Sequence, residues 1–246
     1  MKFSYTYEIQ PQDVDLSRRL RLYTLENYVL NVAGKASNEE GYGLWDLQPL
    51  GYTWIITRLN MELDYIPTHN EVIRIETWVE QNAHMLSTRN YRIYLQETDN
   101  SEQLIGRAKS VWAVLDMTKR EIVNAFNLPM FADKVDGEVL DMPRPARLMP
   151  LTEYDGCVPH IIQYSDCDYN KHCNSCKYLE RMMDAKCPNV ENFPIRLDIN
   201  YIKEVHISEQ IFTRFKTDLQ STSYQQVDQD GKTICSARIS QIEKFK

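Results

Sequence analysis

The residues best suited to chemistry lie in one short polar stretch near the middle of the chain. Asp168, Asn170 and His172 alternate there, so an extended segment would present all three side chains on one face. Leu179 and Met182 then recur at helical spacing, which predicts a helix whose start offers free backbone N–H groups and a partial positive charge. A base, an orienting amide and donors for an anion are the groups needed to hydrolyse an acyl compound.

The elements that must position this stretch occur twice along the chain. Each half is predicted to contain a strand, a helix and a run of antiparallel strands. In the first half the predicted strands are 3–9, 55–65, 72–81, 86–97 and 104–116, with a helix over 22–36. In the second half the predicted strands are 160–164, 195–205, 210–219, 224–229 and 232–242, with a helix that ends near Lys186.

A proline-rich segment separates the two halves. Half of the ten prolines lie in residues 129–159, where they oppose regular secondary structure. We therefore predict an N-terminal domain over 1–136, a linker over 137–159 that lies on the surface, and a C-terminal domain over 160–246.

Short sequence matches indicate that the two halves are copies of one domain. Residues 9–15 match 162–168, and 58–61 match 196–199. Such a repeat is too long for a solenoid unit and indicates a duplicated domain with approximate two-fold symmetry. The predicted fold class is α+β, with a helix against one face of each antiparallel sheet.

The two copies differ at the positions that could do chemistry. In the second copy these positions hold Asp168, Asn170, His172 and Glu204, and in the first they hold Asp15, Ser17, Arg19 and Ile66. Maintaining the fold requires an imidazole and an extra carboxylate in neither copy. We therefore predict that the second half carries the chemistry and that the first supplies a scaffold or an apolar pocket. From spacing alone, Glu204 also fits a solvated residue at the end of a strand.

Composition narrows the class of protein. The apolar fraction of 43% can fill real cores, and no apolar run approaches the ~20 residues of a membrane helix. The N-terminus alternates like a strand and lacks the apolar core of a signal peptide, so a cytoplasmic protein is predicted. The net charge of −7 argues against general nucleic-acid binding, because phosphate contacts need excess Lys and Arg.

The six cysteines lie in the second half of the chain, which favours free thiols over a disulfide framework. Cys173 and Cys176 beside His172 raise the alternative of a zinc site. No second cysteine pair has zinc-finger spacing, so we predict no metal and no cofactor.

At these residues the sequence resembles the acyl-(acyl carrier protein) thioesterases of plants and bacteria, over nearly the whole chain. The motifs of the first half are Trp54-Ile55-Ile56-Thr57-Arg58, Tyr65-Ile66-Pro67-Thr68, Glu76-Thr77-Trp78-Val79 and Arg107-Ala108-Lys109-Ser110-Val111-Trp112. The motifs of the second half are Asp168-x-Asn170-x-His172-x-Asn174 and Leu197-Asp198-Ile199-Asn200-Tyr201, followed by Lys203-Glu204.

The resemblance implies two tandem hotdog domains, each a long helix wrapped by an antiparallel sheet. It implies hydrolysis of the thioester between a fatty acyl chain and carrier-protein phosphopantetheine, with catalytic roles for Asp168, Asn170, His172 and Glu204. Two positions depart from the family pattern. Val205 stands where plant members often have a cysteine, which excludes a cysteine nucleophile there, and Ser175 replaces the second Asn of the motif.

The expected mechanism uses water. Glu204 and His172 would hold and deprotonate the water, and Asn170 would orient it or the thioester. Backbone N–H groups at the start of the following helix would bind the developing oxyanion, a contact often worth ~3 kcal/mol. Asp168 would either orient its neighbours or attack directly through an anhydride, and the sequence leaves both routes open.

Docking of an acidic carrier protein onto this acidic chain requires a local basic patch. The candidates are Arg18, Arg19 and Arg21 near the first helix, and Lys171, Lys177 and Arg181 near the second. The alternative is that these residues form ordinary solvated helix faces.

Three other functions remain open from the sequence. They are an acyl-coenzyme A thioesterase of the same fold, a hotdog dehydratase of 3-hydroxyacyl thioesters, and a protein that binds acyl carriers without catalysis. The chain length of the acyl group and the oligomeric state, including a homodimer, are open as well.

Overall fold

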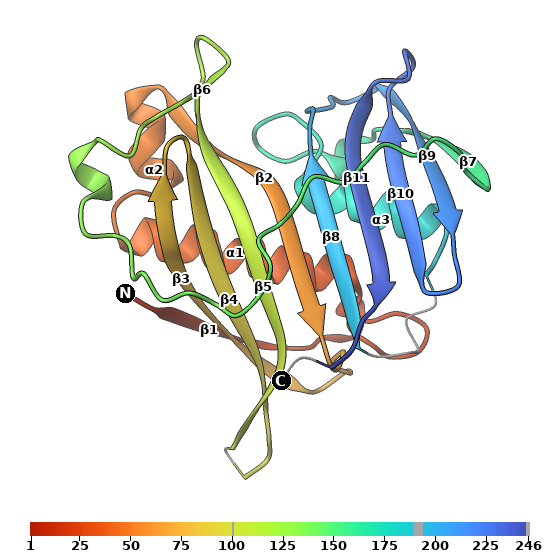
Figure 1. The fold of residues 1–246 in the computed structure, drawn as a ribbon, viewed down its shortest axis with the longest axis horizontal. Helices are drawn as coiled ribbons and strands as arrows, with labels where there is room; N and C mark the ends of the chain where they lie inside the picture. Colours follow the sequence, from red (N-terminus) through yellow and green to blue (C-terminus); the bar gives the residue numbers. More distant parts are fainter. Residues whose placement is uncertain (100, 189–193, 245–246) are drawn as a thin grey trace. The chain divides into compact units, whose positions relative to one another are not determined.

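The computed structural model describes residues 1–99, 101–188 and 194–244, which form two compact units. The first unit comprises Met1–Met61 and Tyr65–Pro145, and the second comprises Glu62–Asp64 and Ala146–Lys246. Each unit packs helix against antiparallel sheet, which confirms the predicted α+β class (Figure 1).

The first unit is built on one long helix, α1 (Leu22–Glu39). Its apolar residues recur every three or four positions and are buried, which explains why this stretch is a helix with one face toward the sheet. The strands are β1 (Phe3–Glu8), β2 (Tyr52–Leu63), β3 (Val72–Ala83), β4 (Leu86–Gln96), β5 (Glu102–Asp116) and β6 (Glu121–Val123). Their order in the sheet is β1-β3-β4-β5-β2, and β6 pairs with β5.

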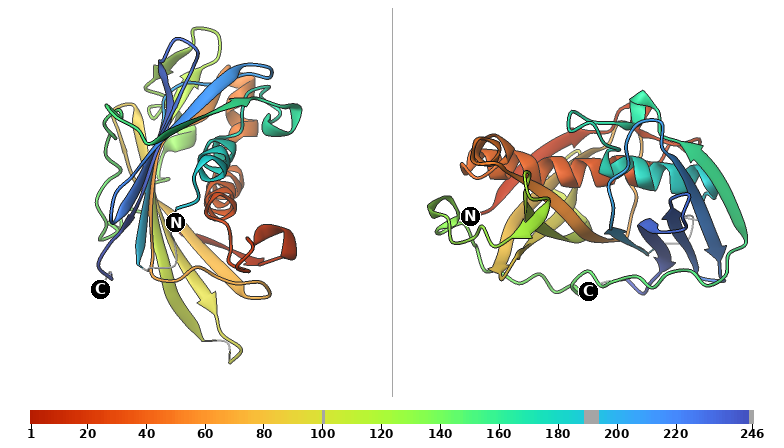
Figure 2. Two further views of the ribbon diagram at one scale, coloured as in Figure 1. Left: turned by 90° about the vertical axis from the view of Figure 1, so that its right-hand side faces the viewer. Right: turned by 90° about the horizontal axis from the view of Figure 1, so that it is seen from above.

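The second unit repeats this plan with a shorter helix, α3 (Ser175–Ala185). Its strands are β7 (Gly156–Ile161), β8 (Ile195–Tyr201), β9 (Gln210–Thr217), β10 (Ser221–Val227) and β11 (Thr233–Gln241). Their order is β8-β11-β10-β9-β7. Leu179 and Met182 of α3 are buried, as the helical spacing predicts, and the helix lies against one face of the unit's own sheet (Figure 2).

Several predicted boundaries are wrong, each for a local reason. The strand predicted over 160–164 lies instead at Gly156–Ile161, where Pro159 is tolerated because β7 lies at the edge of the sheet, next to β9. β8 ends at Tyr201 rather than at residue 205. The first unit also contains a short helix, α2 (Leu44–Leu47), which the sequence pattern does not indicate.

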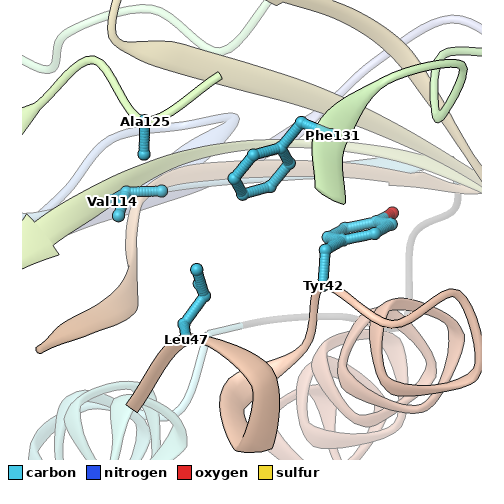
Figure 3. Close-up of a cluster of buried hydrophobic side chains, with 5 residues drawn as sticks. All are labelled: Tyr42, Leu47, Val114, Ala125 and Phe131. Atoms are coloured by element: carbon cyan, nitrogen blue, oxygen red, sulfur yellow. The ribbon is translucent and has the colours of Figure 1, made fainter. Parts of the chain in front are cut away.

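One end of the first unit is filled by aromatic side chains. The buried members of this cluster are Tyr42, Leu47, Val114, Ala125 and Phe131 (Figure 3). Trp54 packs against them and meets the Phe131 ring edge-on, with 5.7 Å between ring centroids. The cluster joins α2, β5 and the segment after β6, so the chain beyond the sheet is part of this core.

The segment 136–145, which we call the strap, crosses the first unit's sheet without regular secondary structure. Leu140 and Met142 pack on the fully buried ring of Trp78. Side chains of the sheet donate hydrogen bonds to strap carbonyls: Trp78 to Glu138 (2.8 Å), Asn90 to Glu138 (3.2 Å), Lys109 to Leu140 (3.3 Å), Asn60 to Pro143 (2.8 Å) and Arg58 to Pro145 (3.4 Å). The strap is therefore a fixed part of the first unit.

Candidate active site

The polar stretch of the second unit is a tight turn and not an extended segment, so the predicted alternation of side chains on one face is wrong. The backbone N–H of Lys171 donates to the carbonyl of Asp168 (3.0 Å), and that of Asp168 donates to His172 (3.1 Å). The Asp168 carboxylate accepts the N–H of Asn170 at 2.8 Å. This local side-chain bond competes with an extended backbone, and Lys171 adopts a positive φ of 66° to complete the turn.

Glu204 reaches the turn from the chain just after β8. The backbone N–H of Lys203 donates to Ile234 (3.1 Å), and the carbonyl of Val205 accepts the N–H of Cys173 (2.7 Å). These bonds lay the segment against the turn, so that His172 stands opposite His206 in an antiparallel bridge.

The result is an imidazole between two carboxylates. His172 Nε2 lies 3.7 Å from Glu204 Oε1, and His172 Nδ1 lies 4.0 Å from Asp168 Oδ1. All three side chains are between 21% and 29% exposed, so substrate and water can reach them. Both separations exceed a direct hydrogen bond, and a separation of this size suits a bridging water.

Asn170, the fourth predicted site residue, meets this group through its backbone. It lies exposed at the tip of the turn, where its backbone N–H bonds to Asp168. Catalytic contacts in an unliganded site often tighten only when substrate binds.

The start of α3 has fewer free donors than the sequence predicts. Asn174 caps the helix, and its side-chain oxygen accepts the backbone N–H of Cys176 at 3.0 Å. The N–H of Lys177 donates to the carbonyl of Asn174 at 2.9 Å. Ser175, the first residue of the helix, therefore occupies the position from which a backbone donor can face a ligand.

The cysteines beside the turn are suited to packing rather than to nucleophilic attack. All six cysteines are free, as predicted, and Cys173 and Cys176 are buried. Burial raises the pKa of Cys173 to about 12, so it is a neutral thiol near pH 7. Val205, at the position of the plant cysteine, is buried and apolar. In the part of the chain that the structure describes, no three His, Cys, Asp or Glu residues are grouped to hold a metal ion.

The basic docking candidates fall into two groups. Arg18, Arg19 and Arg21 precede α1 rather than lying on it, and Lys171 occupies the corresponding turn of the second unit. Lys177 contacts Glu180 at 2.6 Å, and Arg181 contacts Asp184 at 3.0 Å and also Asp166. The charges of these last two residues are therefore balanced by neighbouring carboxylates.

Sequence reasoning missed two features of the site. His206 stands beside His172, with 6.5 Å between ring centroids, and its Nδ1 lies 3.2 Å from the carbonyl of Lys171. Asp166 is fully buried and contacts both His160 and Arg181. The sequence does indicate that Asp166 matters, because an aspartate, Asp13, occupies the matching position of the first copy. It contains no comparable indication for His206.

The long helix wrapped by an antiparallel sheet, present in both units, defines a tandem hotdog protein. The likeness extends to solved structures over almost the whole chain. The acyl-ACP thioesterase of Bacteroides thetaiotaomicron superposes with a TM-score of 0.83, 24% identity, and 97% of each chain covered. The 12:0-ACP thioesterase of Umbellularia californica gives 0.80 and 16%, covering 97% of this chain and 96% of that one.

The chain belongs to the acyl-ACP thioesterase family. Residues 1–127 match the acyl-ACP thioesterase N-terminal domain, and residues 157–243 match the C-terminal domain. The chloroplastic palmitoyl-acyl carrier protein thioesterase of Gossypium hirsutum is 24% identical over 216 residues, covering 82% of this chain and 52% of that protein. The chloroplastic oleoyl-acyl carrier protein thioesterase of Coriandrum sativum is 22% identical over 207 residues, covering 75% and 54%.

The chain spans about half the length of these curated relatives. Across the residues that the structure describes, no helix has both the length and the apolar character needed to cross a membrane.

Proposed function

We propose that this protein hydrolyses the thioester of a fatty acyl group on acyl carrier protein, releasing the free fatty acid and the carrier thiol. The observation that carries the proposal is the grouping of His172, Asp168 and Glu204 in the second unit. The corresponding positions of the first unit hold Arg19, Asp15 and Ile66, so the fold itself does not require the group.

In the proposed reaction a water molecule hydrogen-bonds to both His172 Nε2 and Glu204 from one side, because these two groups are 3.7 Å apart and too distant for a direct hydrogen bond. One of them takes a proton as the water oxygen attacks the thioester carbonyl. The tetrahedral intermediate then collapses, the carbon–sulfur bond breaks, and the departing thiolate takes up the proton. The Asn170 carboxamide and the first backbone N–H of α3 are the proposed donors to the oxyanion.

For Asp168 we propose an orienting role rather than direct attack. Its carboxylate already accepts the N–H of Asn170 at 2.8 Å, and a carboxamide oxygen can accept the same bond. Asp168→Asn is therefore expected to keep the turn and to lower kcat by roughly tenfold, the loss of about one positioning contact. Steady-state rates measure this. A loss of all turnover, equal to that of a His172 variant, would favour the anhydride route.

The two units have different proposed tasks. The N-terminal hotdog, residues 1–136, holds the acyl chain and has no catalytic groups, and residues 160–246 carry the chemistry. Residues 137–159 link the domains, although the first part of this linker packs on the first unit as the strap and its last residues belong to β7. The apolar interior of the first unit and its aromatic cluster at Tyr42 and Phe131 support this division. Arg18, Arg19, Arg21 and Lys171 are the proposed docking residues for the acidic carrier protein. The predicted compartment is the cytoplasm.

The test compares one acyl group on two carriers and identifies the product. Purified protein is given palmitoyl-acyl carrier protein or palmitoyl-coenzyme A, and free thiol and fatty acid are measured together. We expect equimolar acid and thiol, with the higher kcat/KM on the carrier protein. A higher kcat/KM on coenzyme A would assign the acyl-coenzyme A activity instead. With a 3-hydroxyacyl thioester, release of an enoyl thioester would assign a dehydratase.

A further inference from the structure

Asp166 is a buried carboxylate directly before the turn at residues 168–172, which we call the catalytic turn. It has no solvent exposure, and its Oδ2 accepts the backbone N–H of Gln163 at 2.8 Å and lies 3.1 Å from His160 Nε2. Its Oδ1 accepts a hydrogen bond from the Arg181 guanidinium. Burial raises the pKa of Asp166, but the hydrogen bonds from the Gln163 N–H and from Arg181 together lower it by more. The net pKa therefore lies below the ordinary value, and Asp166 is ionised at neutral pH.

The same residue fixes both ends of the turn. Its side chain bonds to the incoming chain at Gln163, and its backbone carbonyl accepts the N–H of Asn174 at 2.8 Å, where the chain leaves for α3. His172 lies between these two fixed points. A shift of Asp166 is therefore passed on to His172, whereas the segment that carries Glu204 is also anchored to the sheet by the bond from Lys203 N–H to the Ile234 carbonyl.

The first unit shows how much of this arrangement the fold needs. Asp13 occupies the place of Asp166, accepts the N–H of Gln10 at 2.9 Å, and its carbonyl accepts the N–H of Arg21 at 3.0 Å. Its side-chain partner is the neutral hydroxyl of Tyr28 at 2.8 Å, and Tyr28 stacks on Tyr7 with 4.3 Å between centroids. A neutral partner is thus enough to form the turn.

We infer that Arg181 is a positioning residue of the catalytic turn, replacing the neutral partner used in the first unit with a charged one. This inference rests on the proposed function. Charge-assisted hydrogen bonds are roughly twice as strong as neutral ones and give tighter geometry. Arg181 also contacts Asp184 at 3.0 Å, which fixes the guanidinium from its other side. Displacing a catalytic group by about 1 Å can cost about a hundredfold in rate.

The test replaces Arg181 with tyrosine, the residue type that binds Asp13 in the first unit. Arg181→Tyr is expected to fold, to lose about 10- to 100-fold in kcat, and to change KM for acyl carrier protein less than twofold. Arg181→Lys, which keeps a positive charge beside the Asp166 carboxylate, should have most of the kcat that Arg181→Tyr loses. Asp184→Asn is the matched control, because it removes the charge of another carboxylate beside Arg181 and leaves Asp166 untouched. Its kcat should equal that of wild type.

Each outcome has a defined meaning. A raised KM with unchanged kcat would make Arg181 a docking residue, and wild-type kinetics would make the charge dispensable; either overturns the inference. If Arg181→Tyr fails to fold, the double variant His160→Tyr with Arg181→Tyr reproduces the stacked pair of the first unit and is measured instead.

Failure of the proposed function is separately visible. If wild type releases no acid from any acyl thioester, the function is wrong, and amide exchange then tests the positioning alone. In that case the Asn174 N–H should exchange faster in Arg181→Tyr than in wild type or Asp184→Asn, and equal exchange would overturn the inference.

Discussion

His172→Ala is expected to lower kcat/KM for acyl-acyl carrier protein by about 10²- to 10⁴-fold, the usual contribution of a positioned general acid or base. The His172 imidazole lies near both Asp168 and Glu204, so its loss removes the group that both carboxylates face. The imidazole is 24% exposed, and its removal leaves only a small cavity. The Tm should therefore stay within about 2 °C of wild type. Steady-state kinetics and calorimetry measure the two effects.

The matched control is His84→Asn. His84 is an exposed histidine in a hairpin of the first unit with a φ of 56°, a conformation that asparagine also adopts readily. This variant should retain wild-type rates. Glu204→Gln should lose activity in the same direction as His172→Ala, because glutamine keeps the shape and cannot take a proton. Full activity in both His172→Ala and Glu204→Gln would remove the proposed mechanism.

Trp78→Ala is expected to destabilise the first unit by about 3–5 kcal/mol, the usual cost of removing a buried aromatic side chain. The Trp78 ring is fully buried against Leu140 and Met142, and its Nε1 donates to the Glu138 carbonyl at 2.8 Å. The substitution removes the packing under the strap and one of the bonds that hold it. For a chain of this length the Tm should fall by about 10 °C, measured by calorimetry.

Trp78→Phe separates the two contributions. Phenylalanine keeps most of the buried ring and loses the Nε1 donor, so the expected cost falls toward the value of one hydrogen bond plus a small cavity, about 1–2 kcal/mol. Proteolysis within 136–145 should follow the same order, with Trp78→Ala cut fastest. An unchanged Tm in Trp78→Ala would show that the strap contributes nothing to the stability of the unit.

The sequence predicts the repeated architecture well because its signals are long and regular. The apolar residues of α1 recur over the full helix, and the long strands β3, β4 and β5 lie close to their predicted bounds. Elsewhere, local hydrogen bonds and a proline make the structure differ from what the residue pattern predicts. The bond from Asn170 N–H to the Asp168 carboxylate turns a segment that alternates like a strand, and Pro159 hides an edge strand.

The candidate site is less accessible to sequence reasoning. The grouping of Asp168 with His172 follows from short spacing, but the approach of Glu204 depends on the bond between Cys173 N–H and the Val205 carbonyl. No periodicity reports such a contact between distant segments. Only the resemblance to the family and the difference between the two copies indicated Glu204.

The strap is held mainly through its carbonyl oxygens, at Glu138, Leu140, Pro143 and Pro145. Every amino acid carries that acceptor, proline included, so most strap positions can change identity without losing their anchor. Deleting or inserting one residue, in contrast, would move each later acceptor away from its donor. Apart from the buried Leu140 and Met142, this segment should therefore accept many changes of residue type, whereas its length should stay constant.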